Sequence, residues 1–209
     1  MVTPKLEGRQ HFDEKHIPIR GGKNHYDLNC IDSKTKYITA HLFVEKRTLR
    51  KCVEFLSQIK ETCYEQILEI YNNERHKSTK DKVLIAFVSD KFGNYKTAWR
   101  KLFSRVTKLV FGVPIACHKH GLEHNNNAIE RENGNIKDRI KTMRGGFENF
   151  EGAEAFLNLR HIIHNFVNPH QGLKGRTPAE EAEIELRLER EKLLKLIQKM
   201  AREKHHSLR

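Results

Sequence analysis

The stretch QHFDEKHIPIRGGKNHYDLNCIDSKTKYITAHLFV, residues 10–44, contains three strand-like segments separated by two turns. Residues 21–24, Gly-Gly-Lys-Asn, form the first turn signal, and residues 32–36, Asp-Ser-Lys-Thr-Lys, form the second. The segments around them are rich in β-branched and aromatic side chains, which favour strands. Because short turns join neighbouring antiparallel strands, the stretch predicts an antiparallel three-strand meander.

After residue 48 the apolar residues change to a helical period. Apolar side chains recur at helical spacing from Leu49 to Ile70, which predicts a long amphipathic helix. Residues 83–88, VLIAFV, are apolar without interruption and predict a short strand buried on both faces. Segments 95–103 and 107–111 predict a further helix and a further strand. The resulting order predicts an α/β fold with a mixed sheet and crossover helices.

The second half of the chain predicts helices. One spans 122–144, with capping asparagines near its start and Gly145-Gly146 at its end, and another spans 151–166. Residues 177–180, Thr-Pro-Ala-Glu, are a favourable helix start. Residues 183–209 predict a charged amphipathic helical tail whose apolar stripe consists of Leu186, Leu193, Leu196, Ile197 and Met200. The tail either pairs with another subunit or packs back on the core, and we favour the first.

The composition favours an acidic partner. Lys and Arg number 39 against 27 Asp and Glu, so the net charge is +12, and nucleic acid is the obvious candidate. With 32% charged residues and a mean hydropathy of -0.72, no run of about 20 apolar residues is present, which excludes a membrane-spanning protein. The first residues lack the apolar stretch of a secretory signal, so we expect an intracellular protein.

The cysteines form no Cys-x-x-Cys pair, which argues against a zinc finger and a disulfide scaffold. Cys117, His118, His120 and His124 could be drawn as a zinc site. Their spacing fits no tetrahedral finger pattern, and we favour a polar loop ahead of a helix.

Three acidic residues stand at positions where mixed sheets assemble sites. Asp13 lies in the first strand, Asp90 follows the central apolar strand, and Glu130 lies near the start of the 122–144 helix. Each of them alone is also explained as a turn or cap residue. Alternation along a strand lets only one of Asp13 and Glu14 face the site and does not choose between them. Asp32 could also face a metal, although its turn sequence favours a structural role.

One face of the 122–144 helix carries a stripe at three-four spacing. Its members are Asn126, Glu130, Gly134, Lys137, Lys141 and Arg144. A carboxylate followed by a glycine and three cations suits a metal-bound phosphodiester whose backbone runs along the helix. Gly134 would allow that backbone to approach closely. A solvated charged face is the alternative.

These segments together resemble the catalytic domain of a DDE transposase of the bacterial and archaeal insertion-sequence type. The resemblance covers about residues 10–182 and rests on 11–14, 22–26, 30–32, 88–90, 126–131, 133–139, 164–170 and 175–180. Its most specific parts are Asn-Asn-Ala-Ile-Glu-Arg at 126–131, His-Asn-Phe at 164–166 and Thr-Pro-Ala-Glu at 177–180. It implies a ribonuclease-H-like fold in which residues 1–9 are an extension, 10–182 the catalytic domain and 183–209 the helical tail.

The resemblance assigns Asp13, Asp90 and Glu130 as the catalytic, metal-binding triad and makes Glu14 and Asp32 non-catalytic neighbours. Two Mg²⁺ or Mn²⁺ ions are implied as cofactors. The 40 positions from Asp90 to Glu130 exceed the usual family spacing, and an insertion around 113–124 would account for this. Glu132 is a second candidate for the third acid, but it lies two helical positions away and points elsewhere.

The implied activity is metal-dependent DNA strand cleavage and strand transfer, that is, DNA transposition. Asn126, Lys137, Lys141 and Arg144 are the expected contacts to double-stranded DNA, at element ends and target. We expect a homodimer or higher oligomer in the cytoplasm, associated with the nucleoid. The first catalytic strand begins near residue 10, which leaves no room for the family's usual N-terminal DNA-binding region. A catalytically silent DNA-binding or dimerisation remnant, and a nuclease that cuts without joining, are therefore the alternatives.

Overall fold

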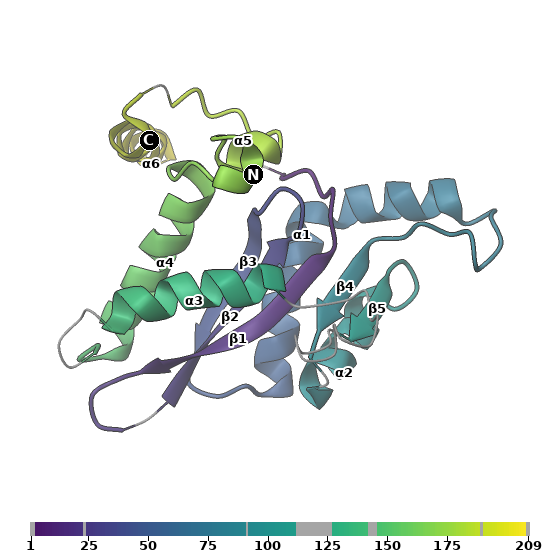
Figure 1. The fold of residues 1–209 in the computed structure, drawn as a ribbon, viewed down its shortest axis with the longest axis horizontal. Coiled ribbons are helices and arrows are strands. Elements are labelled where there is room, and N and C mark those ends of the chain that lie inside the picture. Colours follow the sequence, from purple (N-terminus) through teal and green to yellow (C-terminus); the bar gives the residue numbers. More distant parts are fainter. Residues whose placement is uncertain are drawn as a thin grey trace.

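The computed structural model describes residues 3–22, 24–90, 92–111, 127–141, 146–188 and 190–207. Within these ranges twelve named elements follow one another, as Figure 1 shows for most of them. They are β1 (Gln10–Pro18), β2 (Asn24–Asp32), β3 (Ile38–Val44), α1 (Leu49–Glu74), β4 (Ala86–Ser89), α2 (Gly93–Phe103), β5 (Lys108–Phe111), α3 (Asn127–Lys141), α4 (Phe150–Phe166), the 3₁₀ helix η2 (Gln171–Leu173), α5 (Pro178–Glu181) and α6 (Lys192–Ser207). The predicted order of strands and helices is confirmed.

The five strands form one mixed sheet in the order β3-β2-β1-β4-β5. The β1–β2 and β2–β3 pairs are antiparallel, which confirms the predicted meander. The β1–β4 and β4–β5 pairs are parallel. Gly21 and Gly22 have φ angles of 99° and 82°, so the first turn uses a conformation that glycine adopts without steric cost.

Helices cover both faces of the sheet. Phe12 and Phe87 pack with Tyr95 in the core between the sheet and α1 and α2. On the other face, Ile17 packs with residues of α3 and α4, among them Ile136, and Figure 1 shows α3 crossing in front of the sheet. Because successive strand side chains alternate, Asp13 shares the α3 side with Ile17.

Side-chain caps fix where several helices begin. Thr48 accepts a hydrogen bond from the backbone N–H of Lys51 at the start of α1, and Asn149 accepts one at the start of α4. Thr177 and Glu180 form the predicted capping box of α5. Such caps satisfy N–H groups that the helix itself leaves unpaired.

The predicted strand 83–88 is shifted. β4 begins only at Ala86, because its neighbours supply partners from there on: β5 starts opposite Ala86, and β1 starts opposite Phe87. Val83 is 74% exposed, and its backbone N–H donates to the Glu74 carboxylate at 2.8 Å. The buried part of the prediction is confirmed, since Phe87 and Val88 are fully buried.

The tail predicted as helical over 183–209 is helical only from Lys192. The chain leaves α5 at Glu183, which has a φ of 59°. Ile184 then packs in a small cluster with Ala179 and Ala182. Burying Ile184 therefore stabilises an irregular chain path after α5, although the spacing of the residues that follow favours a helix.

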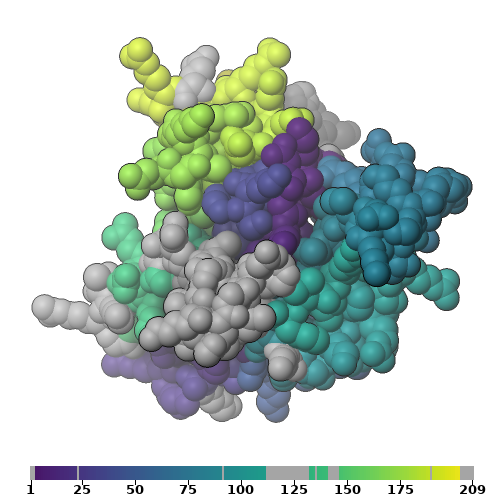
Figure 2. All heavy atoms as spheres, turned by 45° about the vertical axis from the view of Figure 1, so that its right-hand side comes forward, coloured from purple at the N-terminus to yellow at the C-terminus, as the bar shows by residue number. Residues whose placement is uncertain are grey.

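The segment before β1 is held on two sides. The backbone N–H of Leu6 donates to the Gln66 side chain at 2.6 Å, and that of Lys5 donates to the Ala182 carbonyl at 2.9 Å. Figure 2 shows the purple N-terminal residues between the C-terminal elements and the connection from α1 to β4. None of the described helices is long and apolar enough to cross a membrane.

Candidate metal centre and nucleic-acid interface

Asp13 lies in β1, and Asp90 directly follows β4, the parallel neighbour of β1. His11 of β1 lies opposite Val88 of β4, so continuing this register by two residues brings Asp13 level with Asp90, one residue after β4 ends. Carboxylate oxygens of Asp13, Glu14 and Asp90 all lie within 4.8 Å of one another. Carboxylates at this distance repel each other, and a divalent cation with oxygen ligands would relieve that repulsion.

A backbone contact and a buried ring define the surroundings of these acids. Asp90 is exposed, and its Oδ1 accepts a hydrogen bond from the backbone N–H of Phe92 at 3.0 Å. Burial, together with the nearby Asp13 and Asp90 carboxylates, raises the pKa of Tyr95 well above its usual value. The phenol of Tyr95 therefore stays neutral beneath the acidic cluster.

Glu14 has a partner of its own. Its carboxylate forms an ion pair with Arg47, and its side chain is only 8% exposed. The Arg47 guanidinium also lies over the rings of Tyr26 and Phe92, at 4.7 and 4.6 Å from their centroids. A carboxylate already neutralised by a fixed cation is a weaker metal ligand than one without such a cation.

Glu130 lies on α3, and its side chain is outside the described residues. α3 contacts β1 and β2. One turn after Glu130, the Asn133 side chain accepts a hydrogen bond from the Asn29 side chain at 3.3 Å. Asn29 lies directly opposite Asp13 in the β1–β2 pair. Since residues three apart share a helix face, the α3 backbone brings position 130 to the Asp13 side of the sheet.

The two competing acids have structural partners. Asp32 is fully buried and accepts hydrogen bonds from the backbone N–H groups of Glu7, Gly8, Lys34 and Thr35 and from the Gln10 side chain, at 2.7–3.1 Å. Glu132 is 3% exposed and pairs with Nδ1 of His164 in α4 at 3.2 Å. Asp32 thus closes a turn, and Glu132 joins α3 to α4.

A groove of about 700 Å³ runs between β1 and α3 beside Asp13. Lys15, Lys137 and Gly134 also line it. Lys137 is exposed, and among the described residues no heavy atom beyond the local α3 backbone and the two chain neighbours lies within 4 Å of the position that a Cβ on Gly134 would occupy. The groove therefore combines the Asp13 carboxylate with two lysines and a glycine position on α3, which would suit a phosphodiester backbone.

The remaining predicted contacts are only partly described. Lys141 ends α3, and its side chain is outside the described residues. Asn126 and Arg144 lie outside them altogether, as do the cysteine and histidines of segment 117–124.

No protein-family model matches the sequence, and no curated protein matches it. Among solved structures, the chain is similar to the HTLV-2 integrase catalytic core domain in complex with magnesium, with a TM-score of 0.52 and 11% identity, over 87% of this chain and 99% of that one. It is also similar to the catalytic domain of Mos1 mariner transposase, with a TM-score of 0.53 and 10% identity, over 86% of this chain and 79% of that one. The chain has a ribonuclease-H-like integrase and transposase fold.

A second cluster in this ribonuclease-H-like core escaped the sequence reasoning. Asp27 of β2 is fully buried, and its Oδ2 lies 3.1 Å from Nε2 of His161 in α4. Its Oδ1 lies 3.7 Å from Nδ1 of His41 in β3. Burial alone would raise the pKa of Asp27, but the charge and hydrogen bond of His161, helped by His41, lower it below its usual range. The sequence contains one signal for this cluster, namely polar residues on one face of the meander. His41 lies opposite Asn29 in the β2–β3 pair, and Asn29 is two residues after Asp27, so Asp27 and His41 share that face.

Proposed function

We propose that the chain is the catalytic domain of a DDE transposase, which cleaves DNA strands and transfers them with the help of divalent metal ions. The observation that carries the proposal is the meeting of the Asp13 and Asp90 carboxylates where β1 and β4 run side by side. The similarity of the fold to the HTLV-2 and Mos1 catalytic domains supports it. Glu130 of α3 would complete the triad.

The donor set fits magnesium or manganese, because every ligand is a carboxylate oxygen. Two ions held by Asp13, Asp90 and Glu130 would activate water or a DNA 3′-hydroxyl and stabilise the leaving oxygen. The HTLV-2 catalytic core was itself solved in complex with magnesium. No side chain needs to act as a covalent nucleophile.

The protein's own contribution is to hold the acids and to place the DNA. The N–H of Phe92 orients Asp90, and the β1 backbone fixes Asp13 at the groove. Lys137, with Lys141, Arg144 and Asn126, would hold phosphates of double-stranded DNA, both element ends and target. Such contacts position DNA without reading its sequence.

We further propose that the chain acts as a homodimer or higher oligomer on DNA in the bacterial or archaeal cytoplasm. The HTLV-2 integrase core was solved in a dimeric form. A pair of catalytic centres would allow both ends of an element to be processed together.

A nicking and strand-transfer assay on supercoiled plasmid and short duplexes, with Mg²⁺ or Mn²⁺, tests the proposal. Asp13→Asn, Asp90→Asn and Glu130→Gln should abolish both reactions. Glu61→Gln, an exposed acid on α1, is the matched control and should leave them unchanged. Cleavage without joining would favour a nuclease, and salt-dependent DNA binding without cleavage would favour a binding remnant.

A further inference from the structure

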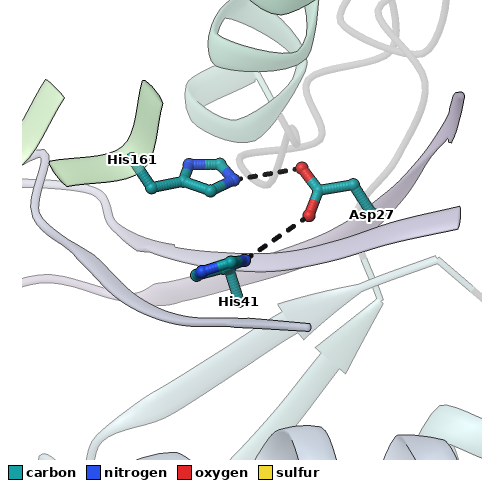
Figure 3. Close-up of side chains that lie close together, drawn as sticks. All are labelled: Asp27, His41 and His161. Atoms are coloured by element: carbon teal, nitrogen blue, oxygen red, sulfur yellow. Dashed lines mark hydrogen bonds and ion pairs between the residues drawn. The ribbon is translucent and has the colours of Figure 1, made fainter. Parts of the chain in front are cut away.

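Asp27, His41 and His161 gather on the face of the sheet that α3 and α4 cover. Figure 3 shows the Asp27 carboxylate facing both imidazoles, with His161 entering from α4 and His41 from β3. Asp27 and His161 have side chains that are 0% and 3% exposed, and the His41 side chain is 24% exposed. The cluster thus joins two strands and a helix that are up to 134 residues apart in sequence.

The spacing of the three groups matches that of metal ligands. One ligand atom from each residue lies within 4.8 Å of the other two. In a tetrahedral zinc site with metal–ligand distances near 2.1 Å, neighbouring ligand atoms are about 3.4 Å apart. The 3.1 Å between Asp27 Oδ2 and His161 Nε2 and the 3.7 Å between Asp27 Oδ1 and His41 Nδ1 lie on either side of that value.

Hydrogen bonding leaves part of this cluster unsatisfied. Oδ1 of Asp27 and Nδ1 of His41 are buried atoms that have no hydrogen-bond partner among the described residues. Buried polar atoms without partners are rare in folded proteins, because the lost hydration is not replaced. These two atoms face each other, and an ion between them would satisfy both.

We propose that Asp27, His41 and His161 bind a zinc-like divalent transition metal ion. Two imidazoles and one carboxylate are a donor set that suits Zn²⁺, whereas the all-oxygen group around Asp13 and Asp90 suits Mg²⁺. The site is therefore distinct in chemistry and does not depend on the proposed function. A water or the amide oxygen of the neighbouring Asn29 would take the fourth position.

The bound metal would fasten α4 to the meander, because His161 comes from α4 whereas Asp27 and His41 come from β2 and β3.

Metal binding by the purified 209-residue chain, after treatment with a chelator, tests the proposal. In millimolar Mg²⁺, which would fill the all-carboxylate group, titration with Zn²⁺ in a calorimeter should show one site per chain. Co²⁺ should give the visible absorption of tetrahedral nitrogen and oxygen coordination, and added Zn²⁺ should displace the Co²⁺ and remove that absorption. His41→Gln and His161→Gln should weaken Zn²⁺ binding by more than about tenfold. His16→Gln, a histidine of β1 that contacts Tyr26, is the matched control and should not weaken it.

Two further measurements keep the result interpretable. Far-ultraviolet circular dichroism checks that each variant is folded, and His41→Gln, whose side chain is the most exposed of the three, is the variant least prone to disturb packing. Cys117→Ser tests the other cysteine- and histidine-rich segment. The proposal is overturned if the wild-type chain binds neither ion, if both His41→Gln and His161→Gln bind Zn²⁺ as the wild type does, or if Cys117→Ser alone removes binding.

Discussion

Replacing Asp90 by asparagine should stabilise the chain in the absence of metal and remove its response to Mg²⁺. Asp13 and Asp90 have carboxylate oxygens within 4.8 Å of each other. Two unit charges 4.8 Å apart repel by about 0.9 kcal/mol at the dielectric constant of water. This value is appropriate because Asp90 is exposed. The asparagine side chain would keep an oxygen that can accept the N–H of Phe92, so no structural hydrogen bond is lost.

In a chain of this size, about 1 kcal/mol corresponds to roughly 2–4 °C in melting temperature. We therefore expect Asp90→Asn to melt a few degrees above the wild type in a chelator. Millimolar Mg²⁺ should raise the melting temperature of the wild type and have little effect on the variant. Differential scanning calorimetry measures both. A variant that melts lower than the wild type without metal, or that gains equally from Mg²⁺, would refute the reasoning.

Four further predictions concern other parts of the molecule. The folded-state pKa of Asp27 lies below its usual value, so its ion pair contributes stability above about pH 4, and this contribution is lost as the pH falls through the folded-state pKa. In urea titrations at pH 7, Asp27→Asn should have a free energy of unfolding about 3–5 kcal/mol below that of the wild type. Between pH 7 and pH 2 the variant should lose less of this free energy than the wild type does, and an equal loss in both would contradict the prediction. Lys137→Ala should lower the slope of log affinity for DNA against log salt by about 0.9, measured by fluorescence anisotropy, whereas Lys80→Ala should not. Gly134→Ala should stabilise α3 by about 0.5–1 kcal/mol in chemical unfolding, because no side chain in the described part of the protein obstructs the new methyl group. The same variant should weaken DNA binding, and unchanged affinity would argue against a close phosphate approach. Deletion of residues 192–209 should convert a dimer to a monomer in sedimentation, and an unchanged mass would show that α6 does not hold subunits together.

The tail prediction rests on which side chains α6 leaves uncovered. Leu196 is buried and α6 contacts α4, so the helix packs in part on its own chain. Leu193, Ile197 and Met200 are 37%, 56% and 55% exposed. Packing of the stripe on the core is therefore seen in part, whereas its pairing with another subunit stays a prediction.

Much of the fold could be predicted because its signals are local. Turn residues such as Gly21 and Gly22 and a change of apolar period are sufficient to order the strands and helices. The start of β4 could not be predicted, because it depends on where β1 and β5 offer partners. The irregular segment after α5 could not be predicted either, because Ile184 is buried through tertiary contacts.

The candidate site, too, could be predicted from the sequence only in part. The end of a buried strand marks Asp90 as a candidate, but only the resemblance to DDE transposases distinguishes Asp13 from Glu14 and selects Glu130. The ion pair of Glu14 with Arg47 depends on a loop more than thirty residues later in the chain. Asp27 and His161 are 134 residues apart, and no local pattern indicates that they meet.

The most direct test of the central claim is the rate of Mg²⁺-dependent DNA cleavage by Glu130→Gln beside the wild type and Glu61→Gln. If Glu130 completes the metal site with Asp13 and Asp90, Glu130→Gln should lose at least about a thousandfold in rate, since metal-ion catalysis supplies several kcal/mol, and Glu61→Gln should cleave as the wild type does. Cleavage by Glu130→Gln at the wild-type rate would contradict the proposed catalytic triad.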